Sequence, residues 1–222
     1  MKFKLLLSLI LISILLCGCS ENDSKLKVGV MPDYDSIPLA IAVSQGYIDD
    51  IAITVPFKSA LDRDSAFYSG AIDVCVTDLM SVILAIDADR EINVLTVTNG
   101  KYCLVGDKSN KSVNSLENKS IGISSGTIIE YSASLLTKNA GKYINVPNIS
   151  MRSALLINGD LQAAVLPEPY AGYCIQNGCN LIDSTKGIGL GVIIANKQKK
   201  NKEKSEKLII GYDKAVDYIN TH

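Results

Sequence analysis

The chain has 222 residues, a formal net charge of −1 and 47% hydrophobic residues. This length allows one large domain or two small lobes, each with its own hydrophobic core. A nearly neutral chain offers no strongly basic surface, so we expect no nucleic-acid partner.

The N-terminus resembles the export signal of a bacterial lipoprotein. Two lysines precede an apolar run, 5–16, which is too short to span a bilayer and matches a signal h-region. The "LCGC" that follows resembles a lipobox. We therefore expect residues 1–18 to be a signal peptide, Cys19 to carry the acyl chains, and 19–25 to form a tether. An ordinary secretory peptide is the alternative. Either reading places the mature protein outside the cytoplasm, and the lipoprotein reading anchors it in the cell envelope.

After the tether, strand patterns alternate with helix patterns. Strands are predicted at 26–31, 51–57, 72–77, 92–98, 101–106, 120–125, 143–147, 161–166 and 189–195. Helices are predicted at 36–46, 60–70, 78–86, 127–139, 150–158, 168–177 and 204–219. This alternation predicts an α/β architecture with mostly parallel sheets.

A weak internal repeat divides the chain in two. "RDSAFYSGAIDVCV" (63–76) and "RSALLINGDLQAAV" (152–165) each place an arginine seven residues before a glycine. Upstream of each copy lies a strand with a central glycine, "KVGVM" or "SIGIS". Two copies of one unit predict two similar lobes hinged about a cleft. We expect lobe 1 to comprise 26–98 and 189–222, and lobe 2 to comprise 99–188.

The remaining cysteines do not suggest a metal site. They are Cys75, Cys103, Cys174 and Cys179, which could pair in three ways. Cys75 lies in an apolar strand and is expected to be a small buried hydrophobe. Cys174 and Cys179 are close enough for a local disulfide, with two free thiols as the alternative. Because His222 is the only histidine, we expect neither a zinc site nor a cofactor.

Several segments in series resemble a known family. "KVGVMPDYDSIPLAIAVSQGYID", "VPFKSALDRDSAFYSGAIDVCVTDL", "IGISSGTIIEY" and "LLINGDLQAAVLPEPYA" are similar to solute-binding lipoproteins of bacterial ABC importers. The nearest branch binds nitrate, sulfonates, taurine or thiamine-pyrimidine precursors. The resemblance covers about residues 26–220. It implies a two-lobed periplasmic-binding-protein fold (type II-like) with a small-molecule ligand between the lobes. It also implies an ABC permease and its ATPase as partners. Family members usually continue for several dozen residues past the helix that resembles "YDKAVDYIN".

Ligands of such folds bind beyond the carboxyl ends of the parallel strands. The candidate ligand-binding residues in these loops are Pro32, Asp33, Tyr34, Lys58, Ser59, Thr77, Asp78, Ser124, Ser125, Gly126, Thr127 and Glu168. Each has a structural alternative. The loop at 32–35 could be a solvated turn, Lys58 a surface lysine, and Asp78 a helix N-cap.

The "SSGT" loop is the expected anion-binding end of the cleft. Backbone N–H groups and the helix dipole favour an anion or a carbonyl oxygen there. Thr127 and Glu130 also form a capping-box pattern. We expect this box to leave the amides of Ser125 and Gly126 available to a ligand.

Glu168 is the expected acceptor at the other end. It stands between Pro167 and Pro169 at the end of a strand, which fixes the direction of its carboxylate. Capping of the next helix is the alternative. A rigid acceptor selects N–H or O–H donors, which favours an amino-pyrimidine or an amino-sulfonate over a simple anion.

Three functions compete. The first is capture of a small organic solute and its delivery to an ABC permease. The second is a ligand-sensing or degenerate lipoprotein of the same fold. The third is an enzyme resembling pyrimidine synthases, whose histidine-rich chemistry has no counterpart in a chain with one histidine. No motif for a nucleophile or a phosphate-binding loop is present, so we expect no enzymatic activity.

Overall fold

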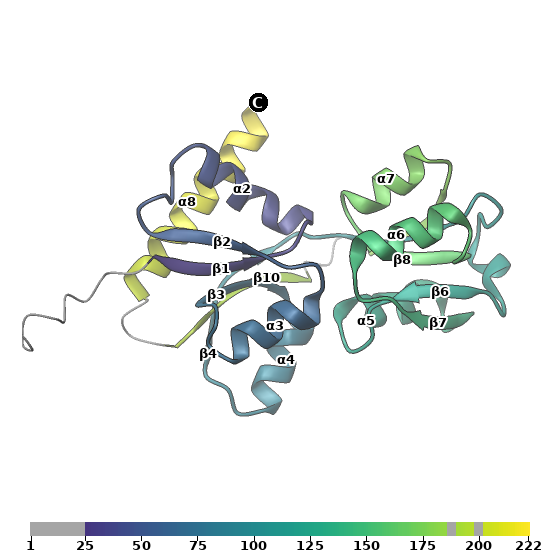
Figure 1. Ribbon diagram of the computed structural model, residues 1–222, viewed down its shortest axis with the longest axis horizontal. Helices are drawn as coiled ribbons and strands as arrows, with labels where there is room; N and C mark the ends of the chain where they lie inside the picture. The colour runs from purple at the N-terminus through teal and green to yellow at the C-terminus, as the bar shows by residue number, and fades with distance from the viewer. Residues whose placement is uncertain (1–24, 186–189, 198–201) are drawn as a thin grey trace, which may run out of the picture.

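The computed structural model describes residues 25–185, 190–197 and 202–222. The expected signal peptide and Cys19 lie outside these residues, as does most of the tether. Figure 1 shows two lobes joined side by side, each built on its own sheet.

Lobe 1 is built on a five-stranded sheet with the order β2-β1-β3-β10-β4. Its strands are β1 (Leu26–Val30), β2 (Ala52–Pro56), β3 (Val74–Asp78), β4 (Ile92–Thr98) and β10 (Gly191–Asn196). Its helices are α2 (Ile37–Ser44), α3 (Ala60–Tyr68), α4 (Leu79–Asp87) and α8 (Lys202–Thr221), with a short 3-10 turn η1 (Tyr34–Ser36) before α2.

Lobe 2 repeats this plan with the order β7-β6-β8-β5-β9. Its strands are β5 (Tyr102–Gly106), β6 (Ser120–Ile123), β7 (Lys142–Asn145), β8 (Ala163–Pro167) and β9 (Asn180–Ser184). Its helices are α5 (Ile128–Thr137), α6 (Ile149–Asn158) and α7 (Tyr170–Gln176), with a 3-10 turn η2 (Val113–Leu116) before β6.

Each sheet is covered by helices on both faces. In lobe 1, one core joins the sheet to α2 and α8, and another joins it to α3 and α4. In lobe 2, one core joins the sheet to α5, and the other joins it to α6 and α7. The predicted two-lobed α/β fold is confirmed as a pair of three-layer sandwiches.

Strand direction is more mixed than the sequence suggested. Parallel pairing holds for β1 with β2 and β3, and for β6 with β7 and β8. In contrast, β10 runs antiparallel to β3 and β4, and β5 runs antiparallel to β8 and β9. The strand β9 was not expected at all. Each sheet therefore has a parallel half and an antiparallel half among the described residues.

The glycine shared by the two repeats has a steric role. A Cβ atom on Gly29 of β1 would lie 2.3 Å from Ile72 Cδ1 and 3.4 Å from Arg63 Cγ. A Cβ atom on Gly122 of β6 would lie 2.5 Å from Leu161 Cδ1 and 3.1 Å from Arg152 Cγ. In each lobe, the central glycine thus makes room for an apolar side chain, Ile72 or Leu161, with the repeat's arginine packed beside it.

The two segments that cross between the lobes are held together. The N–H of Tyr102 donates to Thr185 Oγ1 over 3.0 Å, and the N–H of Thr185 donates to the carbonyl of Tyr102 over 2.9 Å. The buried carboxylate of Asp35 lies against both crossings, since a Cβ on Gly100 would lie 1.9 Å from Asp35 Oδ2 and one on Gly191 would lie 2.7 Å from it. These contacts place one carboxylate at the hinge.

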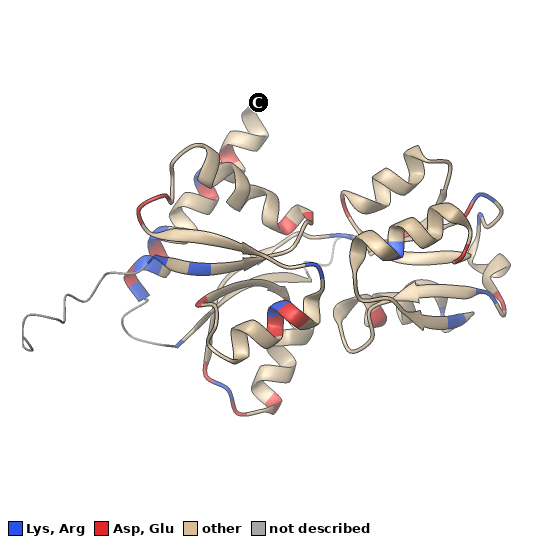
Figure 2. Ribbon diagram, viewed as in Figure 1, with Lys and Arg blue, Asp and Glu red and all other residues tan. Residues whose placement is uncertain are grey.

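The four cysteines of the described residues are buried free thiols. Cys75 lies inside β3, as expected for a small buried hydrophobe. Of the two alternatives for Cys174 and Cys179, the structure has the free thiols. None of the described helices is long and apolar enough to cross a membrane. Figure 2 shows acidic and basic residues interspersed over both lobes.

Candidate ligand-binding cleft

A cavity lies between the lobes where the strands end. Its lining residues are Met31, Asp33, Ala60, Arg63, Asp78, Tyr102, Ser124, Thr127, Ile128, Ile129, Pro147, Ile149, Arg152 and Pro167. Many of them follow the carboxyl ends of β1, β3, β6 or β8, as expected for this class of fold. Tyr102 begins the antiparallel β5 and pairs with Pro167 at the end of β8, so it reaches the same edge.

The cavity is small because the lobes lie close together. Its volume is about 30 Å³, which is room for about one or two water molecules. Two backbone hydrogen bonds join the lobes beside it: the N–H of Tyr34 to the carbonyl of Glu168, 2.9 Å, and the N–H of Ile149 to the carbonyl of Lys58, 3.4 Å. An organic solute can enter only if the lobes move apart.

One arginine from each lobe lines this cavity, and both belong to the sequence repeat. Arg63 is 3% exposed and Arg152 is 1% exposed. Arg63 donates to Thr77 Oγ1 over 2.7 Å and lies 2.9 Å from Asp64 and 3.8 Å from Asp78. Its charge is therefore balanced within lobe 1.

Arg152 has no carboxylate partner among the described residues. Its guanidinium donates to the carbonyls of Val165, Val146 and Pro147 over 3.0, 2.6 and 3.4 Å. Burial lowers the pKa of Arg152 to about 10, which still leaves it charged at neutral pH. A buried, unneutralised cation at a cavity favours an anionic partner.

The "SSGT" loop brings a second polar group to the same side. Ser124 is 2% exposed, lines the cavity, and its hydroxyl has no hydrogen-bond partner in the described structure. Thr127 also lines the cavity and caps α5, because its Oγ1 accepts the N–H of Ile129 over 3.2 Å. A buried unpartnered hydroxyl beside a helix N-terminus is an unused hydrogen-bonding position.

The expectation that the Ser125 and Gly126 amides stay available was wrong. The N–H of Ser125 donates to Asn145 Oδ1 over 3.0 Å, and the N–H of Gly126 donates to Glu130 Oε2 over 2.8 Å. The capping glutamate reaches one residue farther back than the usual capping box. Neither Ser125 nor Gly126 lines the cavity.

The lobe 1 side of the cavity carries acids. Asp78 caps α4, accepting the N–H groups of Met80 and Ser81 over 3.0 and 3.2 Å, and also lines the cavity. Asp33 accepts the N–H of Ser36 over 3.1 Å. Burial raises the pKa of each carboxyl to about 6. Nearby acids add to this effect: Asp35 acts on Asp33, and Asp64 acts on Asp78, where Arg63 opposes it.

The other predicted residues have structural partners or lie away from the cavity. Thr77 donates to Asp64 Oδ1 over 3.1 Å, and Ser59 caps α3 by accepting the N–H of Asp62 over 3.2 Å. The side chains of Pro32, Tyr34 and Lys58 are exposed and do not line it.

Glu168 also lies outside the lining of the cavity. Its Oε2 accepts the N–H of Gly172 over 2.8 Å, so the carboxylate caps the first turn of α7. Its Oε1 lies 4.0 Å from Cys103 Sγ. The capping alternative therefore describes Glu168 in this arrangement of the lobes.

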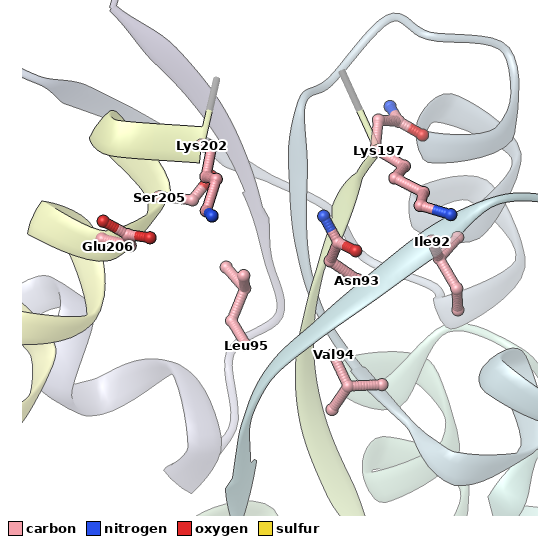
Figure 3. Close-up of a pocket in the computed structure, with 9 residues that line it drawn as sticks. Ile92, Asn93, Val94, Leu95, Lys197, Lys202, Ser205 and Glu206 are labelled. Carbon is pink, nitrogen blue, oxygen red and sulfur yellow. The ribbon is translucent and has the colours of Figure 1, made fainter. Parts of the chain in front are cut away.

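A larger hollow of about 510 Å³ lies elsewhere on lobe 1 (Figure 3). It is lined by residues of β4, the end of β10 and the start of α8, and none of them belongs to lobe 2. Movement of the lobes would not enclose a molecule there. The described residues also hold no group of three or more His, Cys, Asp or Glu side chains arranged for a metal ion.

Comparison with known proteins identifies the fold. No family model and no curated protein matches the chain. Among solved structures, it resembles the ligand-binding component of an ABC-type import system from Staphylococcus aureus with zinc bound. The TM-score is 0.72 at 15% identity, over 90% of this chain and 79% of that one.

Two further structures agree. The alkanesulfonate-binding protein of Xanthomonas axonopodis pv. citri bound to MOPS gives a TM-score of 0.70 at 13% identity, over 86% of this chain and 72% of that one. A Candida albicans protein described as having the generic periplasmic-binding-protein fold gives 0.68 at 18%, over 90% of this chain and 72% of that one. The chain thus has the two-lobed α/β fold of the periplasmic binding proteins.

Proposed function

We propose that this protein is an extracytoplasmic, lipid-anchored solute-binding protein. It captures a small organic solute between its lobes and delivers it to an ABC permease with its ATPase. The observation that carries the proposal is the interlobe cavity, where both lobes present buried polar groups. Among the described residues, Arg152 there has no carboxylate partner and the Ser124 hydroxyl has no hydrogen-bond partner. The relatives with solved structures, which include an alkanesulfonate-binding protein, support this class.

The polarity of the cleft defines the proposed ligand. The lobe 2 side offers Arg152, the Ser124 hydroxyl and the N-terminus of α5, which suit an anionic group. The lobe 1 side offers Asp33 and Asp78, which suit N–H donors. A solute with a sulfonate at one end and an amine or amino-pyrimidine at the other satisfies both sides. Glu168 of lobe 2 lies outside the lining of the cavity, and because Oε2 caps α7, only Oε1 would remain for a ligand when the lobes separate.

Binding and lobe closure are coupled in this mechanism. The ligand would enter between separated lobes and replace water around both charged sides. The lobes then close onto the ligand, which holds them farther apart than in the structure, where the contacts of Tyr34 with Glu168 and of Ile149 with Lys58 leave room for only about one or two water molecules. The closed form is the species that docks to the permease.

Mass spectrometry of the gently purified mature protein tests the proposal. We expect a co-purified organic solute, and a rise in melting temperature when sulfonates or amino-pyrimidines are added to the stripped protein. If no pyrimidine, sulfonate, nitrate or flavin is retained or shifts the melting temperature, the ligand-sensing or degenerate alternative replaces the transport proposal.

A further inference from the structure

A second interlobe pocket adjoins the cavity. Its volume is about 340 Å³, and it shares Met31 and Asp33 with the cavity. Pro32, Ile37 and Ala40 of lobe 1 line it together with Pro169 and Tyr170 of lobe 2. For comparison, an apolar cavity of about 150 Å³ is enough to hold benzene. The pocket is thus large enough for a six-membered ring or a chain of several methylene groups.

Ser36 and Tyr170, which line this pocket, already have hydrogen-bond partners. Ser36 Oγ accepts the N–H of Met31 over 3.1 Å, while the N–H of Ser36 donates to Asp33 Oδ1 over 3.1 Å. The hydroxyl of Tyr170 lies in a 2.9 Å hydrogen bond with Ser150 Oγ. What the pocket presents to a ligand is therefore mainly apolar surface.

The pocket keeps most of its wall when the lobes separate. Eight of its ten lining residues belong to lobe 1, and only Pro169 and Tyr170 come from lobe 2. The backbone bond from Tyr34 to Glu168 lies beside those two residues in sequence. A group seated on the lobe 1 wall would therefore gain the Pro169 and Tyr170 contacts as the lobes close.

We infer that the solute carries an apolar substituent, attached near the end that faces Asp33, which occupies this pocket. The inference rests on the proposed function, because the polar head of the same solute must lie in the cavity. Met31 and Asp33 line both spaces, so a tail in the pocket lies next to a head in the cavity, which favours one occupant over two separate ligands. The ligand class is thus an N-substituted amino-sulfonate or a similar zwitterion with an alkyl or ring tail.

Calorimetry with a matched pair of probes tests this inference. We expect N-cyclohexyl-2-aminoethanesulfonate to bind at least tenfold more tightly than 2-aminoethanesulfonate, a gain that burial of about two methylene groups already supplies. Ala40→Phe, on the exposed wall of the pocket, should remove this gain and leave binding of 2-aminoethanesulfonate unchanged. Val43→Phe, on the same helix but outside the pocket, is the control and should leave both affinities unchanged.

The outcomes separate this inference from the proposed function. Equal affinities for the two probes, or a cyclohexyl gain that survives Ala40→Phe, overturn the tail pocket and leave the proposed function standing. If neither probe binds, both the proposed zwitterion class and the tail pocket are overturned. The co-purification experiment then decides the transport function on its own.

Discussion

Ser124 and Ser132 both bury a hydroxyl without a hydrogen-bond partner among the described residues. Only Ser124 lines the interlobe cavity, whereas Ser132 lies inside α5. A buried unpaired hydroxyl costs stability unless something binds it. An unpartnered hydroxyl therefore has a different consequence at each position. At Ser132 it only lowers stability, whereas at Ser124 it offers a hydrogen bond to a ligand oxygen.

Replacing these two serines should separate stability from binding. We expect Ser124→Ala to raise the free energy of unfolding by about 1 kcal/mol, because an unsatisfied hydroxyl is removed, and to weaken solute binding about three- to tenfold. Ser132→Ala should give a similar gain in stability with no change in affinity. Urea titration and calorimetry measure the two effects, and an unchanged affinity in Ser124→Ala would remove this residue from the site.

Asp33 gives the cleft a pH dependence. Burial, with Asp35 nearby, raises its pKa from 3.8 to about 6, so the folded state prefers the protonated carboxyl. The resulting stabilisation is fully present below about pH 4 and is lost as the pH rises through 6. Relative to Asp33→Asn, the wild type should lose roughly 2 kcal/mol between about pH 4 and pH 7.

Urea unfolding of both proteins at several pH values measures this loss. Asp49→Asn removes one negative charge at an exposed turn and controls for the change in net charge. A difference between wild type and Asp33→Asn that stays constant with pH would contradict the assignment.

At the scale of elements, the arginine of each repeat depends on the strand beneath it. The guanidinium of Arg152 ties the segment after β7 to β8 through the carbonyls of Val146 and Val165, and its stem crosses Gly122 of β6. The Arg152 side chain therefore links α6 to β8 and also lines the cavity. The matching arrangement of Arg63 beside Gly29 shows that both copies of the repeat pack a helical arginine against a strand glycine.

Gly122→Ala should disturb stability and binding together. The new Cβ would lie 2.5 Å from Leu161 Cδ1 and 3.1 Å from Arg152 Cγ, within a fully packed core. We expect a loss of about 2 kcal/mol in the free energy of unfolding and a weaker affinity for the solute, since Arg152 must shift. Gly159→Ala is the control. It strains a backbone with φ of +85° but meets nothing within 4 Å, so it should cost about 1 kcal/mol and leave affinity unchanged.

Most helices and strands could be predicted from the sequence because each has a local pattern of apolar residues and end-capping residues. Every predicted strand and helix has a counterpart, and Thr127, Ser59 and Asp78 cap helices at the ends of apolar patterns. The strand β9 was missed because "NLIDS" is short, polar and half-exposed. Its pairing with β5 comes from tertiary context. The apolar run of β10 indicated burial but carried no signal for antiparallel direction.

The site was harder to predict than the fold. Asp33, Asp78, Ser124 and Thr127 were expected and do line the cavity. Arg63 and Arg152 were seen as members of a repeat but not as site residues, because a helical arginine is ordinarily exposed. Their identical spacing before a glycine was the available signal. The prediction that the Ser125 and Gly126 amides are available failed for a different reason. Asn145 is distant in sequence, and no local pattern shows that its side chain accepts the N–H of Ser125.

At the scale of the whole molecule, the hinge depends on the space beside Asp35. A Cβ on Gly100 would fall 1.9 Å from Asp35 Oδ2 and 2.6 Å from its Cγ, so the first crossing passes against the carboxylate. The second crossing is joined to the first through Thr185 and Tyr102. Because the Asp35 carboxylate contacts both crossings, movement of the lobes changes its surroundings.

Gly100→Ala should shift the lobes away from the closed arrangement. The added methyl group displaces the Asp35 carboxylate, and we expect a larger radius of gyration by small-angle scattering and weaker solute binding. Asp35→Ala with Gly100→Ala removes the clash and should restore the wild-type radius, so the two substitutions are not additive. A double variant that behaves as the sum of the single ones would contradict the steric account.

The position of β10 also determines the order in which the chain can complete its lobes. All strands of lobe 2 lie in one continuous stretch, from β5 to β9. Lobe 1 is different: β10 is inserted between β3 and β4, and among the described strands β4 pairs with β10 alone. Until residues 191–196 are in place, β3 has an open edge and β4 has no sheet to join. We therefore expect lobe 2 to fold before lobe 1, and the long-range pairing of β10 to be the slow and aggregation-prone step of folding.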